Sequence, residues 1–366
     1  MKKFIKILAF SIIITFYFLV LTVAYYEGPL ISFQSLILGI LGMISITLGA
    51  SAFAKKINLV DSPDNQRRFH KGVVPLVGGS SLFISIVYGA FIFGVDPFYK
   101  TLIISLIPIL IVSILDDLKG MPITYRLVGQ ILASWIVIIM TDIYLRDLGN
   151  LFGTGIIDLG ALGIPFTIFA VVGICNAFNM IDGKDGIAGT IALIIFVLIS
   201  ILFFLDSNFY KWGFILIMSL LVFLSFNLGL LGKKRKVFLG DHGSITLGHI
   251  VGWTMIYLSQ DQGLIKPVTA LWFVFLPLTD ALLTFFRRIR LSSSIFHSDT
   301  QHFHHFLARK NLSDPAILIV IFAISLLTGI VAILGNINDL SEVNLFFGYL
   351  TVLIILILLG SNRKKN

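Results

Sequence analysis

Residues 163–186, GIPFTIFAVVGICNAFNMIDGKDG, show how an apolar run of this chain ends in a cluster of polar side chains. Asn176, Asn179 and Asp182 follow one another at three-residue spacing where the apolar run stops. On a helix, each three-residue step returns to within about 60° of the same face. We therefore expect these side chains to share one side of a helix end, where Gly183 and Gly186 break the helix.

The chemistry of this segment suits a cation. Asp185 adds a second acid close to Asp182. Oxygen-bearing side chains beside a glycine turn favour a hard cation such as Mg²⁺, which usually binds together with phosphates. The segment therefore predicts a divalent cation beside a phosphate-bearing substrate.

The composition of the whole chain excludes a soluble globular protein. The 366 residues are 57% hydrophobic and 13% charged, and the mean hydropathy is +0.99. Such values predict an all-α, polytopic membrane protein with about 11 or 12 transmembrane helices. The apolar runs lie at about 4–24, 31–54, 77–94, 99–115, 127–141, 163–178, 187–205, 212–232, 243–259, 267–286, 315–335 and 345–360.

Basic residues predict the orientation of these spans. If the N-terminus is inside, all but four of the 27 Lys and Arg residues lie in inside regions. The exceptions are Lys100, Arg146, Lys211 and Lys266. Because Lys and Arg mark cytoplasmic loops, the active site is expected on the cytoplasmic face, where the polar clusters lie. The net charge of +8 then reflects membrane orientation and indicates no nucleic-acid partner.

The first apolar run has two interpretations. Lys2, Lys3 and Lys6 precede it, as in a cleavable signal sequence, but its apolar stretch is longer than usual for one. We expect residues 1–30 to hold an extra span or signal-like segment, followed by an integral membrane domain over 31–366. Cys175 is the single cysteine, which excludes an intrachain disulfide and a cysteine-based metal site.

Four further polar clusters lie in the expected inside loops. The first, within Asp61–Gly79, carries Arg67, Arg68, His70 and Lys71, and its alternative explanation is ordinary positive-inside charge. In the second, Asp116 and Asp117 are adjacent at a span end. Neighbouring carboxylates there usually share a cation or a proton, and a solvated helix end is the alternative.

The other two clusters suggest phosphate and nucleotide contacts. Glycines flank Asp241 in FLGDHGS, which suits a loop around a phosphate, although a simple helix cap is equally compatible. The segment FHSDTQHFHHFLARK carries His302, His304 and His305, which we expect to hydrogen-bond a diphosphate or nucleotide; a zinc trio is the less favoured alternative. Asp280 lies seven residues before Arg287, on a similar helix face. We expect Asp280 to pair within the helix bundle.

Together these motifs resemble the polyprenyl-phosphate N-acetylhexosamine-1-phosphate transferase family, in its bacterial undecaprenyl-phosphate branch rather than its muramoyl-pentapeptide branch. The resemblance covers about residues 55–310. It rests on five motifs in family order: RRFHKGVVPLVGG, DDLKG, NAFNMIDGKDG, FLGDHGS and HSDTQHFHH.

The resemblance implies a phosphotransferase of the bacterial inner membrane. It would transfer an N-acetylhexosamine 1-phosphate from a UDP-sugar to undecaprenyl phosphate and release UMP, the initiating step of a cell-envelope glycan. The implied cofactor is Mg²⁺, with Mn²⁺ as an alternative, and a homodimer is compatible with the family.

The resemblance also implies a role for each site residue. Asp116 would deprotonate or position the lipid phosphate, and Asp117 would support that phosphate or the metal. Asp182 would ligate Mg²⁺. The implied substrate-binding residues are Arg67, Arg68, His70, Lys71, Asn176, Asn179, Asp185, Asp241, His302, His304 and His305.

Two residues depart from the family pattern. Lys184 stands where an aliphatic residue is usual, and we expect it to pair with Asp185. His242 replaces a small residue in the FLGDHGS motif, and its expected role is contact with the nucleotide or sugar. The competing hypotheses are a secondary transporter, which predicts charges near the bilayer midplane, and an inactive scaffold, which has no reason to retain clustered carboxylates.

Overall fold

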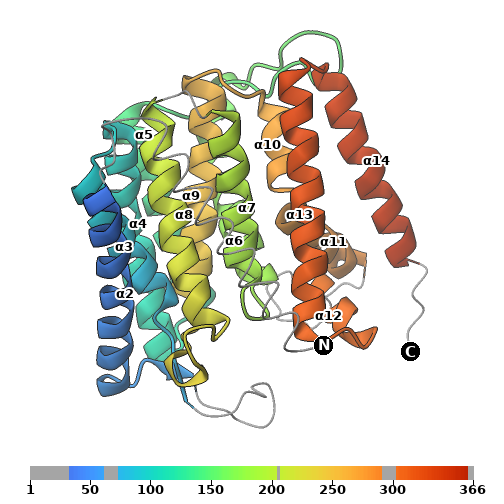
Figure 1. The fold of residues 1–366 in the computed structure, drawn as a ribbon. Coiled ribbons are helices and arrows are strands. Elements are labelled where there is room, and N and C mark those ends of the chain that lie inside the picture. Colours follow the sequence, from blue (N-terminus) through green and yellow to red (C-terminus); the bar gives the residue numbers. More distant parts are fainter. Residues whose placement is uncertain (1–32, 62–72, 204–206, 291–301, 362–366) are drawn as a thin grey trace. The chain divides into compact units, whose positions relative to one another are not determined.

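The computed structural model describes residues 33–61, 73–203, 207–290 and 302–361. Within them the chain is helical except for loops and a two-residue strand pair, so the predicted all-α fold is confirmed (Figure 1). The helices that match predicted runs are α2 (Phe33–Lys56), α3 (Gly78–Phe93), α4 (Pro97–Lys119), α5 (Ile123–Thr141), α6 (Gly163–Ile181), α7 (Ile187–Leu202), α8 (Ser207–Asn227), α9 (Asp241–Ile256), α10 (Pro267–Phe273), α11 (Phe275–Arg290), α13 (Asp314–Ile337) and α14 (Glu342–Ser361). The run at 4–24 and the expected 1–30 segment lie outside the described residues.

Not every run is one straight span. Six described helices are long and apolar enough to cross a membrane, and a seventh span is possible if α10 and α11 count as one. These two meet at an angle of 84°, so the apolar run predicted over 267–286 forms two helices with a sharp bend between them. Pro277 supplies the physical reason, because it has no N–H to bond the carbonyl of Phe273 four residues earlier.

The chain forms two compact units, residues 1–126 with 199–246 and residues 127–198 with 247–366. In the first unit, α3 packs against α2 and α8. Gly89 allows α3 to approach α8, since a Cβ there would lie 2.8 Å from the Ile215 side chain. Tyr99 of α4 stacks on Trp212 of α8, with ring centroids 4.8 Å apart. Large buried aromatic groups therefore form the centre of this unit.

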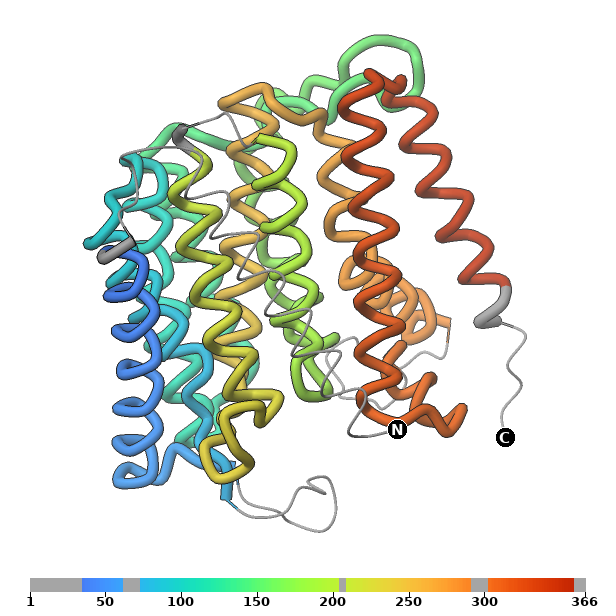
Figure 2. Tube along the Cα trace, in the orientation of Figure 1, coloured from blue at the N-terminus to red at the C-terminus, as the bar shows by residue number. Residues whose placement is uncertain are grey.

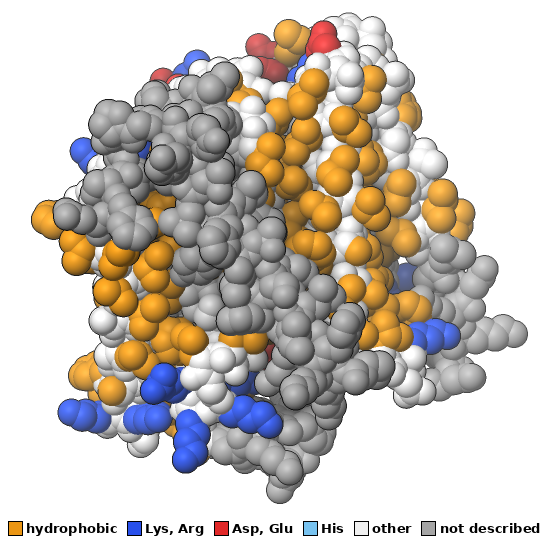
Figure 3. Space-filling model, viewed as in Figure 1, with side chains coloured by type: hydrophobic (Ala, Val, Ile, Leu, Met, Phe, Trp, Pro, Cys, Tyr) orange, Lys and Arg blue, Asp and Glu red, His pale blue; other side chains and the backbone are white. Residues whose placement is uncertain are grey.

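The outer side of the first unit is apolar and one of its ends is basic. Leu38, Leu41 and Phe53 of α2 are exposed, as lipid-facing side chains would be. Lys55 and Lys56 follow in the last turn of the same helix. Figure 3 shows hydrophobic side chains along the helices and basic side chains gathered beyond them. This distribution is typical of a membrane-spanning bundle.

In the second unit, α6 packs against α11, and α10 packs against α13 and α14 (Figure 2). The Trp272 indole of α10 donates a hydrogen bond to the Leu345 carbonyl of α14 at 3.0 Å. A short helix, α12 (Phe303–Arg309), contacts α13. Leu327 and Ile337 of α13 are exposed on the outside of the unit. The packing of α12 determines where the predicted histidine motif lies.

Candidate functional site

Two motifs that are distant in the sequence meet through the backbone in the first unit. Strand β1 (Val60–Asp61) pairs antiparallel with β2 (Val74–Pro75). Just after β2, the Gly78 amide donates to the Phe238 carbonyl at 2.8 Å and the Gly79 amide donates to the Leu239 carbonyl at 2.9 Å. The end of the VVPLVGG segment is thereby fixed beside the FLGDHGS motif.

Asp116 lies in the last turn of α4, which ends at the left-handed residue Gly120. Its Oδ1 accepts a hydrogen bond from the Met121 amide at 2.6 Å, and its Oδ2 lies 3.3 Å from Nε of Arg126. The Asp116 side chain is only 12% exposed. The alternative of a solvated helix end is therefore wrong for this acid, which is held by a cation and a backbone donor.

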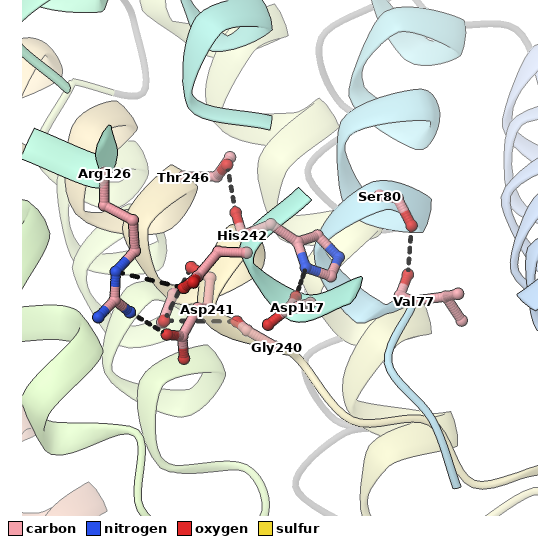
Figure 4. Close-up of polar contacts among 10 residues, drawn as sticks. Val77, Ser80, Asp117, Arg126, Gly240, Asp241, His242 and Thr246 are labelled. Carbon is pink, nitrogen blue, oxygen red and sulfur yellow. Dashed lines mark hydrogen bonds and ion pairs between the residues drawn. The ribbon is translucent and has the colours of Figure 1, made fainter. Parts of the chain in front are cut away.

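Arg126 joins two of the predicted acidic motifs. Its Nη1 pairs with Oδ2 of Asp241, the first residue of α9 (Figure 4). Its Nε faces Oδ2 of Asp116. An arginine suits this position because its planar guanidinium presents several donors to two carboxylates at once. In the sequence, Arg126 is distinguishable only as one of the basic residues of the expected inside loops. Its spacing from the acids in the sequence gave no indication of this role.

Asp117 is paired with His242, a residue for which the sequence predicts contact with the nucleotide or sugar. Its Oδ2 lies 2.7 Å from Nδ1 of His242 (Figure 4). The His242 side chain is fully buried. The prediction that His242 contacts the nucleotide or sugar is therefore wrong in this structure, because the ring faces Asp117 inside the protein. A buried imidazole next to a carboxylate is typical of a residue that orients a functional group.

In the second unit, the NAFNMIDGKDG motif ends α6 as predicted. The Asn176 amide nitrogen donates to Gln130 Oε1 at 2.9 Å and to the Val172 carbonyl at 2.7 Å. Asn179 lies in the final turn, and Asp182 follows directly as the residue that ends the helix. The sequence thus placed the helix end correctly, whereas the contact between Asn176 and Gln130 had no signal in the sequence.

Lys184 forms an ion pair with Asp314, the first residue of α13. Asp314 begins a helix, where a carboxylate is favoured by the helix dipole. The expected pair of Lys184 with Asp185 stays a prediction. Asp185 lies in the turn that precedes α7.

The histidine motif is anchored by Asp280, a buried acid of α11. Asp280 Oδ2 lies 2.9 Å from Nδ1 of His302, and its Oδ1 accepts a hydrogen bond from the Phe303 amide at 2.7 Å. Asp280 does pair within the bundle, as expected, and its partner is His302. This acid therefore positions the start of α12.

His304 brings the histidine motif against the NAFNMIDGKDG motif. A Cβ on Gly183 would lie 2.0 Å from Nε2 of His304, so this close approach requires glycine. Burial lowers the pKa of His304 from its usual 6.5 to about 3, and the neighbouring histidines and Lys184 act in the same direction. His304 is therefore neutral, and its ring lies at a tilt of 45° to that of His305, with ring centroids 4.2 Å apart.

The remaining predicted residues have simpler outcomes. Arg67, Arg68, His70 and Lys71 lie outside the described residues.

No three His, Cys, Asp or Glu side chains among the described residues are grouped so that they could hold a metal ion. Mg²⁺ does not require such a cage, because it commonly uses one or two carboxylates together with substrate phosphates and water. The carboxylate oxygens described above are ligands of the type it prefers.

The sequence of this chain matches known proteins. The family model described as glycosyl transferase family 4 matches residues 99–259. An undecaprenyl-phosphate alpha-N-acetylglucosaminyl 1-phosphate transferase of Escherichia coli (strain K12) is 34% identical over 330 residues, which are 86% of this chain and 87% of that protein.

Relatives with the same name from other bacteria agree with this match. The Haemophilus influenzae protein is 34% identical, over 86% of this chain and 90% of its own length. The Yersinia pestis protein is 34% identical, over 78% of this chain and 80% of its own length. Each of these matches covers more than two thirds of this chain and of the relative. The chain therefore belongs to glycosyl transferase family 4.

Proposed function

We propose that this protein transfers N-acetylglucosamine 1-phosphate, or a closely related N-acetylhexosamine 1-phosphate, from a UDP-sugar to undecaprenyl phosphate. The products are the undecaprenyl-diphosphate sugar and UMP. The observation that carries the proposal is the set of partly buried acids, Asp116, Asp117 and Asp241, each held by Arg126 or His242. The names of relatives that match over most of the chain support the same reaction.

The reaction joins a phosphate monoester to a diphosphate, so its main difficulty is negative charge. An oxygen of the lipid phosphate attacks the sugar-linked phosphorus, and the bond to the UMP oxygen breaks. Catalysis then depends mainly on alignment and charge neutralisation. We propose that Arg67, Arg68 and Lys71 contribute positive charge to the phosphates, and that His302, His304 and His305 contact the nucleotide diphosphate.

Divalent metal is part of the proposal. Asp182 and Asp117 would hold Mg²⁺, with Mn²⁺ as a substitute, and Asn176, Asn179 and Asp185 would contact the substrates nearby. When bound, the ion would supply charge neutralisation at the phosphates. Asp116, which contacts Arg126 and the Met121 amide, would position the lipid phosphate or accept its proton.

We further propose that the site faces the cytoplasm of a bacterial inner membrane. In the first unit, the last turn of α4 holds the acids of the DDLKG motif and also Lys119. The last turn of α2 holds Lys55 and Lys56. Lys and Arg are retained on the cytoplasmic side of membrane proteins. A cytoplasmic site also has access to nucleotide sugars, and a lipid-linked product there would begin a cell-envelope glycan.

The decisive experiment measures UMP release by the purified protein. It should be given undecaprenyl phosphate, Mg²⁺ and a panel of UDP-N-acetylhexosamines, and the lipid product should be identified by mass spectrometry. We expect UMP release with at least one donor and loss of release on chelation of Mg²⁺. No release with any donor, from protein that is folded in detergent, would reject the proposed reaction. The transporter alternative predicts uptake into vesicles without UMP formation.

A further inference from the structure

The His242 ring lies in a narrow slot between two glycines of the first unit. A Cβ on Gly79 would lie 2.6 Å from Cδ2 of His242, and a Cβ on Gly240 would lie 2.7 Å from Cε1. Both distances are too short for any side chain to be added without movement of the ring. Gly240 also has a φ of +74°, which favours glycine for a second reason. The His242 ring therefore occupies space that a side chain at either glycine would need.

Within the residues that the structure describes, the one polar contact of this ring is with Asp117. Nδ1 of His242 lies 2.7 Å from Oδ2 of Asp117, whereas Nε2 is buried without a hydrogen-bond partner in the described part of the chain. A carboxylate can only accept, so Nδ1 carries the hydrogen and donates it. The hydrogen bond and the slot together fix the direction in which the carboxylate points.

The two adjacent acids consequently differ in what they can offer a substrate. Asp116 uses Oδ1 for the Met121 amide and Oδ2 for Arg126. Asp117 uses Oδ2 for His242, while its Oδ1 makes no hydrogen bond within the described residues. Its side chain is 11% exposed. Asp117 therefore presents a single oriented oxygen outward, whereas both oxygens of Asp116 are engaged.

We propose that His242 is a positioning residue that holds Asp117 so that only Oδ1 is offered to the reacting phosphate and its divalent cation. This inference rests on the proposed function, because it assigns a role within that reaction. His242 itself touches no substrate, since it is fully buried. The role is specific to a chain with histidine here, where the family that the motif resembles has a small residue.

The test compares His242→Asn with His242→Leu in the purified full-length protein. Asparagine and leucine have nearly the same shape, but only asparagine has a side-chain N–H, located like Nδ1 of histidine. The measurements are kcat and KM for UMP release and, independently, Mn²⁺ affinity by electron paramagnetic resonance. We expect His242→Leu to lower kcat about 10- to 100-fold and to weaken Mn²⁺ binding, the usual effect of losing a partner behind a metal-binding group.

His242→Asn should recover most of both properties, and KM for the UDP-sugar should change little in either variant. The matched control is His249→Leu, which removes another fully buried histidine from the same helix and should leave kcat and Mn²⁺ affinity near wild type. If the leucine variant does not fold, His242→Ala is compared with His242→Asn instead.

Equal kcat and Mn²⁺ affinity for the asparagine and leucine variants would overturn the inference, because the ring would then act only by filling space. Wild-type values for His242→Leu would overturn it as well. Both outcomes require an active wild-type protein. They are therefore distinguishable from failure of the proposed reaction, in which the wild-type protein itself releases no UMP.

Discussion

The acids of the first unit and the buried acid of the second unit show two uses of carboxylates. Asp116 and Asp117 are held by Arg126 and His242 and retain some exposure. Asp280 is buried, and its two carboxylate oxygens contact the His302 ring and the Phe303 amide. The difference teaches that burial of an acid near a motif does not identify it as reactive. The partners of its oxygens are more informative.

The largest expected effect on activity comes from removing the negative charge of one acid in each unit. We expect Asp116→Asn and Asp182→Asn to reduce kcat more than about 1000-fold, because each removes a negative charge that the reaction requires. UMP release measures this loss, and elution as a single peak in detergent checks that the variants are folded. Near-normal turnover in either variant would remove that residue from the proposed site.

The structural role of Asp280 predicts a loss of stability. Asp280→Ala leaves the buried His302 ring and the Phe303 amide without their acceptor, and we expect the unfolding free energy to fall by about 3 kcal/mol. The lower melting temperature can be followed by intrinsic fluorescence. Asp142→Ala is the control, because its exposed pair with Arg146 should contribute no more than about 1 kcal/mol. Equal effects of the two substitutions would contradict the distinction between the acids.

The contact of the histidine motif with the glycine turn can be tested with two glycines near the same motif. Gly183→Ala would place a Cβ 2.0 Å from His304, and we expect a destabilisation of about 1–3 kcal/mol from overpacking. Gly173→Ala, on α6, meets no atom within 4 Å and should be nearly neutral. Melting temperatures of both variants provide the measurement. A harmless Gly183→Ala would show that the two motifs are not packed together.

A smaller effect concerns the pH dependence of the second unit. His304 has a folded-state pKa of about 3, below its usual 6.5, so between these values the unfolded chain binds more protons than the folded protein. Stability should therefore fall as the pH decreases below about 6.5, by at most about 1.4 kcal/mol per pH unit. The melting temperature should vary less with pH in His304→Gln. An unchanged pH profile would show that His304 does not set this dependence.

Much of the fold could be predicted from the sequence because each apolar run has its own local signal. The runs at 99–115 and 163–178, for example, correspond to α4 and α6 with shifts of a few residues at their ends. The break between α10 and α11 was missed, since apolar character continues through Val274 although Pro277 interrupts the hydrogen bonding. Hydropathy shows whether a run of side chains is apolar, but it does not show where the backbone hydrogen bonds of a helix are interrupted.

The site was predictable in its members but not in its pairings. Asp116, Asp117 and Asp241 attracted attention because acids beside apolar runs are costly. Arg126 resembled any loop cation, and its two partners are separated from one another by more than a hundred residues. His242 was assigned to the wrong partner for the same reason. Only the folded chain shows which charges meet.

The glycine slot around His242 has an evolutionary consequence. A lineage that acquires a side chain in place of Gly240 has no room left for an imidazole two residues later. Histidine at the place of His242 should therefore occur only together with glycine at the place of Gly240, whereas the glycine can persist where a small residue replaces the histidine. When related sequences are aligned, a chain with histidine at the place of His242 but alanine at the place of Gly240 should be rare, and its Asp117 would need a different neighbour.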